Sequence, residues 1–93
     1  MKIQDLETDI LLTKLDTNYV DEDYKMGYIN GLEAFTKRYK QNYSLVDLNK
    51  HLIDLTKGFK GSYIDGFVLA YKSNLTKLEK ELKHLYIGGI NYD

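Results

Sequence analysis

Glu81 and His84 stand three residues apart, which is the ligand spacing found in helical di-iron sites. Such sites need a second Glu-x-x-His pair and further carboxylates from facing helices. This chain has one such pair, set in a stretch whose apolar residues are leucines at helical spacing. We therefore interpret Glu81 and His84 as part of an exposed helix surface.

His51 offers a second arrangement, because Asp47 precedes it by four residues and Asp54 follows it by three. Three such groups on one helix face could bind a metal ion or act as a general base. No second histidine lies nearby in the sequence, so the spacing favours an exposed face of ion pairs. We expect no metal here.

The consecutive acids Asp21, Glu22 and Asp23 lack the alternating ligands and the glycine of a calcium loop. Acidic residues are favoured at the positive N-terminal end of a helix dipole. The three acids therefore predict the start of a helix rather than a cation site.

Other catalytic apparatus is missing from the sequence. There is no cysteine, which excludes disulfides, thiolate metal sites and cysteine nucleophiles. The glycines do not have the spacing of a phosphate-binding loop, and no Ser, His and Asp arrangement has a motif context. We predict no catalytic residues, no cofactor and a protein that is not an enzyme.

The apolar periodicity predicts helices throughout, with no stretch that alternates as a strand would. The predicted helices span about residues 3–16, 20–41, 45–57 and 62–86. Gly58 and Gly61 bracket the turn after the third, and Gly88-Gly89 is expected to end the fourth. With 93 residues, the chain is expected to form one domain, 1–93, as an all-α, compact antiparallel bundle of four helices.

One signature occurs twice: Tyr-Ile, then Asn or Asp, then Gly and a large apolar residue. Residues 24–32 align with residues 59–67, and each copy follows a shorter, leucine-rich amphipathic segment. The bundle is therefore expected to consist of two related helical hairpins. The pattern does not match the tetratricopeptide repeat, whose Leu-Gly pair, later alanines and terminal proline have no counterparts here.

Small residues recur at a spacing of four in both signature helices. Residues four apart share a helix face, so each helix has a notch where another backbone can approach closely. Because glycine inside a helix costs roughly 0.5–1 kcal/mol relative to alanine, we expect each notch to be occupied. The simplest occupant is the other signature helix, crossing at Gly31 and Gly66; a homodimer contact or a groove for a partner helix or ligand are alternatives. The predicted crossing residues are Gly27, Gly31, Ser62, Gly66 and Ala70.

The chain has nine tyrosines, an unusually high number for its length. Several fall on the apolar stripes, and others fall near helix ends, where tyrosine commonly serves protein interfaces. Combined with nearby basic residues, they give the candidate binding residues Tyr19, Arg38, Tyr43, His84, Tyr86 and Tyr92.

Charge is unevenly distributed along the chain. Residues 1–23 are rich in acids and residues 24–60 are rich in bases, which suggests that the first helix lies against a basic body. Nucleic-acid binding by the basic segment 37–60 is an alternative, although the net charge of −1 argues against it.

These observations favour a non-enzymatic protein-binding module, a small regulator or inhibitor that docks on another macromolecule, with another protein as its partner and a homodimer as an alternative. In length and expected four-helix architecture the chain resembles the bacteriocin immunity proteins of low-GC bacteria, with no shared motif, and the resemblance implies an immunity role as an alternative. The excess of lysine over arginine is typical of an AT-rich bacterial genome or its mobile elements. No signal peptide and no apolar stretch long enough to span a membrane are recognisable, so we expect a cytoplasmic protein.

Overall fold

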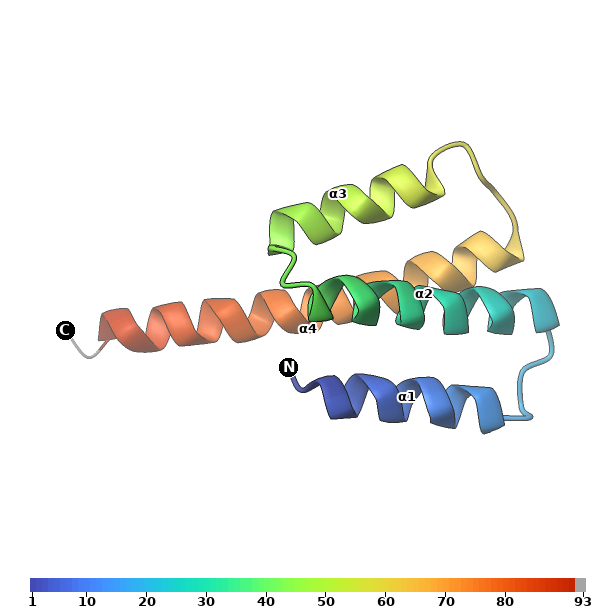
Figure 1. The fold of residues 1–93 in the computed structure, drawn as a ribbon, viewed down its shortest axis with the longest axis horizontal. Helices are drawn as coiled ribbons and strands as arrows, with labels where there is room; N and C mark the ends of the chain where they lie inside the picture. Colours follow the sequence, from blue (N-terminus) through green and yellow to red (C-terminus); the bar gives the residue numbers. More distant parts are fainter. Residues whose placement is uncertain (92–93) are drawn as a thin grey trace.

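A computed structural model describes the backbone of residues 1–91 and the side chains of residues 1–84. Its four helices are α1 (Ile3–Leu15), α2 (Glu22–Lys40), α3 (Leu45–Thr56) and α4 (Ser62–Asn91), shown in Figure 1. The predicted all-α bundle is confirmed, and the first three helices agree with the prediction within two residues at each end. Among the described residues, no helix combines the length and the apolar character needed to cross a bilayer.

The predicted end of the fourth helix at Gly88-Gly89 is wrong, because α4 continues to Asn91. Each glycine weakens a helix by about 1 kcal/mol relative to alanine, but glycine keeps the backbone N–H that proline would remove. As a result, the C-terminal part of α4 projects well beyond the other three helices (Figure 1).

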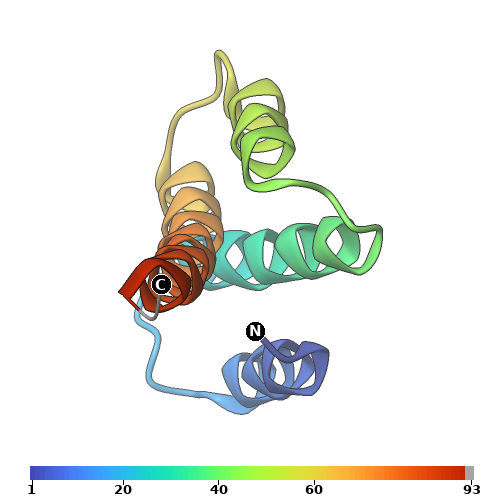
Figure 2. The same ribbon diagram turned by 90° about the vertical axis from the view of Figure 1, so that its left-hand side faces the viewer.

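Successive helices run in opposite directions, so α2 and α4 run parallel to each other at the centre of the molecule (Figure 1). This pair makes the most extensive contact between helices. The helices α1 and α3 lie on opposite sides of it, as Figure 2 shows along the axis of α4. The two hairpins, α1–α2 and α3–α4, are therefore joined through their signature helices.

The helices α2 and α4 approach so closely that Gly27, Gly31 and Gly66 have no room for a side chain. A Cβ on Gly27 would lie only 1.8 Å from the backbone oxygen of Tyr63. A Cβ on Gly66 would lie 2.2 Å from the backbone oxygen of Tyr24. Each notch is therefore occupied by the backbone of the other signature helix.

The register of this contact differs from the expected crossing of Gly31 with Gly66. A Cβ on Gly31 would lie 2.4 Å from the backbone oxygen of Phe67 and 3.1 Å from the Cβ of the fully buried Ala70. The reason is that ridges of one helix pack into grooves of the other, so a glycine receives a large residue's backbone rather than a second glycine. Ser62, at the start of α4, lowers the pKa of Asp21, the N-cap residue of α2.

All four helices contribute to one hydrophobic core. Its largest fully buried side chains include Phe35 and Tyr71, whose rings meet edge to face with centroids 5.4 Å apart. Such pairs add about 0.5–1.5 kcal/mol beyond the area that they bury. The buried cluster consists of Leu6, Phe35, Leu48, Leu52, Tyr71, Leu75 and Leu78.

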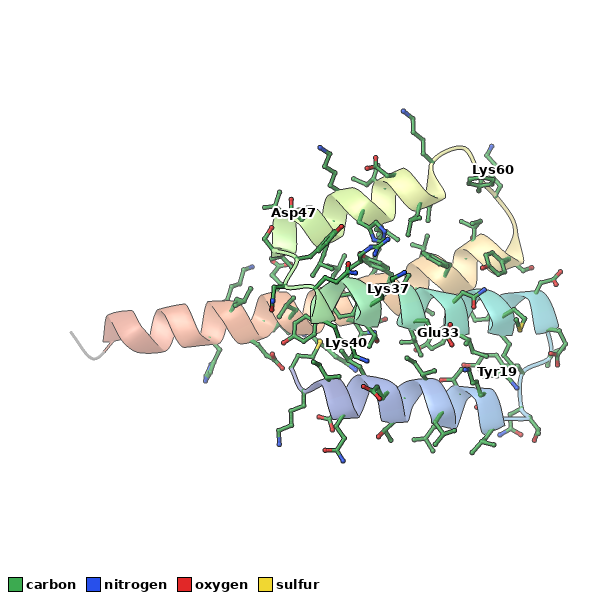
Figure 3. All side chains as sticks on the ribbon, viewed as in Figure 1. Tyr19, Glu33, Lys37, Lys40, Asp47 and Lys60 are labelled. Atoms are coloured by element: carbon green, nitrogen blue, oxygen red, sulfur yellow. The ribbon has the colours of Figure 1, made fainter. Side chains whose placement is uncertain are left out.

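The helix α1 contributes one buried side chain, Leu6, to the core. Ion pairs at its surface also connect it to α2. Ion pairs of 3.0 Å join Lys40 to Glu7 and Lys14 to Glu33; Figure 3 labels Lys40 and Glu33 on the side of α2 that faces α1. In the first pair an acid of α1 meets a base of α2, as the charge distribution predicts. In the second pair the base belongs to α1 and the acid to α2. Because both pairs are about half exposed, they contribute little to stability.

Candidate functional site

The structure brings together Arg38 and Tyr43 from the predicted binding residues. The guanidinium carbon of Arg38, in the last turn of α2, lies 5.7 Å from the centroid of the Tyr43 ring. His84 is exposed on the part of α4 that projects. The side chains of Tyr86 and Tyr92 lie outside the described residues.

Tyr19 lies at the α1–α2 connection, at the far end of the molecule from the start of α3 (Figure 3). Its ring packs against Tyr24 and Tyr28, with centroids 6.3 and 6.4 Å away, and the amine of Lys25 lies 5.9 Å from its centroid. Lys25 also donates a hydrogen bond to the backbone oxygen of Asp16. Partial burial raises the pKa of the Tyr19 hydroxyl. Through these contacts Tyr19 stabilises the α1–α2 connection.

The position of Tyr43 follows from the way α2 ends. Asn42 has a φ of 62°, the left-handed conformation that asparagine tolerates better than most residues. Its N–H donates to the oxygen of Tyr39 at 3.0 Å, and the N–H of Tyr43 donates to the oxygen of Arg38 at 3.2 Å. This pair of bonds is a Schellman motif. It turns the chain so that the Tyr43 ring meets the Arg38 guanidinium, an attractive cation–π contact.

A chain of hydrogen bonds continues from Arg38 into the core. The Nε of Arg38 donates to the Nε2 of His51 at 3.1 Å, and the Nδ1 of His51 lies 3.0 Å from the Tyr71 hydroxyl. That hydroxyl donates its single proton to the backbone oxygen of Leu48 at 2.9 Å. The proton between His51 and Tyr71 must therefore belong to Nδ1, so His51 is the neutral Nδ1–H tautomer.

The surroundings of the two rings keep them uncharged. Burial, and then the positive charge of Arg38, lower the pKa of His51, while Asp54 acts in the opposite direction. Burial raises the pKa of Tyr71 to about 12. At neutral pH the cluster Arg38–His51–Tyr71 is therefore a fully hydrogen-bonded link between α2, α3 and α4.

The prediction that His51 forms an exposed ion-pair face with Asp47 and Asp54 is wrong. His51 is partly buried, and its hydrogen bonds go to Arg38 and Tyr71. One signal was present in the sequence: His51 follows the buried Leu48 by three residues, which places it beside the apolar stripe of α3.

The remaining acidic candidates have structural partners. Glu81 pairs with the amino group of Met1, which ties the start of the chain to α4. Asp21 caps α2 by accepting from the amides of Asp23 and Tyr24 at 3.0 and 3.2 Å. Within residues 1–84, no three His, Asp or Glu side chains gather in a way that could hold a metal ion.

A cleft of about 770 Å³ lies where α4 leaves the body of the molecule. Residues from the start of α1, the end of α2, the α2–α3 loop and α4 line this cleft, which we call the α4 cleft. Of its apolar lining, Leu82 is 46% exposed and Ile3 is 40% exposed. Its lining also includes Tyr39, Tyr43, Leu45, Leu78 and the two lysines Lys2 and Lys40.

Comparisons of the chain with known protein families, with curated proteins and with solved structures gave no match. Two features of the chain itself bear on its function: the α4 cleft, and the Arg38–His51–Tyr71 cluster that lies behind the Tyr43 wall of that cleft.

Proposed function

We propose that the protein is a non-enzymatic binding module, a small regulator or inhibitor that holds a segment of another protein in the α4 cleft. The observation that carries this proposal is the change in exposure along one face of α4. Leu78 is buried in the core, whereas Leu82, one turn later on the same face, is 46% exposed beside the cleft. A partner that covers such apolar surface gains roughly 25 cal/mol for each Å² removed from water.

The charges of the cleft indicate the kind of segment that fits it. Lys2 is among the described residues that line it and no acidic residue is among them; Lys40 also lines it but is already paired with Glu7 of α1. Complementary charge speeds encounter and excludes wrong partners. The occupant that we propose is therefore an amphipathic segment with apolar side chains on one face and acidic side chains at its edges.

Nucleic-acid binding by residues 37–60 is less well supported. Arg38 donates into the protein, to His51, and Lys40 is paired with Glu7. Neutralising phosphates would require these side chains to leave their partners. We expect no mobility shift of DNA or RNA even at low salt, where phosphate contacts are strongest.

Affinity capture from cells that carry the gene tests the proposal, with two matched variants. Leu82→Glu places a charge in the cleft, whereas Leu11→Glu places one on α1 at a residue that is 57% exposed. We expect the wild type and Leu11→Glu to retain the same partner and Leu82→Glu to lose it. Equal capture by both variants, or no protein above background with the wild type, would refute the proposal.

A further inference from the structure

His51 lies behind the wall of the α4 cleft and joins three parts of the fold. It accepts a hydrogen bond from Arg38 of α2, contacts Tyr71 of α4, and meets the Tyr43 ring nearly edge-on with centroids 6.0 Å apart. Tyr43 in turn lines the cleft. A change of charge on His51 therefore acts on a residue that a docked segment would touch.

We propose that His51 is a proton sensor, and that its protonation detaches Arg38, loosens the Tyr43 wall and weakens docking in the α4 cleft. The part that concerns docking rests on the proposed function. The part that concerns Arg38 and Tyr43 is a property of the isolated protein and is tested separately.

Protonation acts on one particular bond. A proton added to neutral His51 must go to Nε2, the atom that accepts from Arg38 Nε at 3.1 Å. Two N–H donors, both on cations, would then face each other at that distance, so this bond is lost. The Nδ1–H of His51 keeps its contact with the Tyr71 hydroxyl.

Loss of the Arg38–His51 hydrogen bond also affects the contacts of Tyr43. Arg38 is the cation that lies over the Tyr43 ring, and its second hydrogen bond goes to Gln41 at 3.1 Å, in the last part of the same turn. Once Arg38 moves away from His51, the Tyr43 ring loses the guanidinium contact. Leu48 and Leu52, which are buried, continue to hold α3 on the core.

The charged and titratable groups around His51 are Arg38 from α2, Tyr43 from the loop, Tyr71 from α4, and Asp47 and Asp54 from its own helix. Burial and Arg38 outweigh Asp54, so the pKa of His51 lies below its ordinary value of 6.5. The contribution of neutral His51 to stability is complete above 6.5 and is lost as the pH falls from there through the lowered pKa.

An NMR titration of the isolated protein from about pH 8 to about pH 5 tests the sensor. We expect the Tyr43 ring signals to change with the same midpoint as His51, below 6.5. In Arg38→Met the His51 midpoint should rise and Tyr43 should stop following it. In His51→Gln the Tyr43 response should disappear, while His84→Gln, at the other histidine, should leave it unchanged.

A Tyr43 ring that does not follow His51, or that still titrates in His51→Gln, would overturn the sensor. Once a captured partner is purified, its Kd should rise about tenfold on acidification for the wild type and stay constant for His51→Gln. An unchanged wild-type Kd would overturn the link to docking. Failure to capture any partner counts against the proposed function, whereas the Tyr43 titration decides the sensor without a partner.

Discussion

Gly27 of α2 lies directly against the backbone carbonyl of Tyr63 in α4, with no space between them for a β-carbon. The same relationship recurs between Gly66 and Tyr24 from the opposite direction. Because the obstructing atoms are backbone, neither contact can be relieved by turning a side chain. The parallel α2–α4 pair that supports the whole molecule therefore depends on glycine at these positions.

Replacing these glycines should separate the helices. We expect Gly27→Ala and Gly66→Ala each to lower the free energy of unfolding by about 2–3 kcal/mol, even after the gain in helix propensity. Urea denaturation measures this change. Lys50→Ala, at an exposed residue of α3, should stay within about 0.5 kcal/mol of the wild type. Glycine variants as stable as this control would show that the crossing is looser than described.

Removing the hydroxyl of Tyr71 should be costly, because it leaves the His51 Nδ1–H without a partner and removes the bond to the Leu48 oxygen. We expect Tyr71→Phe to lose about 1–3 kcal/mol of stability. The control is Tyr63→Phe, whose hydroxyl accepts from Asn30 at an exposed position. Thermal unfolding followed by circular dichroism compares the two. An equal, small effect of both changes would argue against the buried hydrogen bonds of the Arg38–His51–Tyr71 cluster.

The left-handed conformation of Asn42 determines which substitutions the α2–α3 turn tolerates. Asn42→Val should lower the free energy of unfolding by about 1–2 kcal/mol, because β-branched residues are strained at positive φ. Asn42→Gly should be tolerated, since glycine adopts this conformation freely. The Tyr43 ring shifts report the local effect, and they should change in the valine variant alone. Disturbance of Tyr43 by the glycine variant would contradict the assignment of the motif.

Asp21 should make the protein sensitive to acid. The hydrogen bond from Ser62, followed by the one from the Tyr24 amide, lowers the pKa of this carboxyl below 3.8. Its contribution to stability is therefore present above 3.8 and is lost as the pH falls through the lowered pKa. Ser62→Ala should move the pKa of Asp21 upward in a carboxyl-detected NMR titration. An unmoved pKa in Ser62→Ala would contradict the Asp21–Ser62 bond, and Thr76→Ala, exposed on α4, serves as the control.

Local patterns in the sequence were sufficient to predict the helices. Apolar spacing and the acids at the start of α2 gave boundaries within two residues for three helices. These patterns did not predict that α4 continues through Gly88-Gly89. Helix propensity gives the free-energy cost of a glycine in a helix, but it does not determine whether the helix ends there. Small residues at a spacing of four indicated which faces meet, but not the register, since that depends on how two sets of ridges interlock.

The cluster around His51 could not be predicted in this way. Its partners Arg38 and Tyr71 belong to α2 and α4, and their proximity depends on the tertiary packing of α3. Within its own helix, the acidic residues four before and three after His51 are Asp47 and Asp54, so helical periodicity connects His51 to them. Helical spacing places Tyr71 on the apolar face of α4, but the hydrogen-bond partner of its hydroxyl depends on the folded chain.

Site-specific photo-crosslinking in cells that carry the gene tests most directly whether another protein occupies the α4 cleft. A photoreactive residue at Leu82 or Leu45 would lie in the cleft, and one at Leu11 or Val46 would lie on the exposed faces of α1 and α3. We predict one discrete protein adduct from the two cleft positions and none from the two control positions. Adducts from the control positions alone, or no adduct from either cleft position, would contradict the claim.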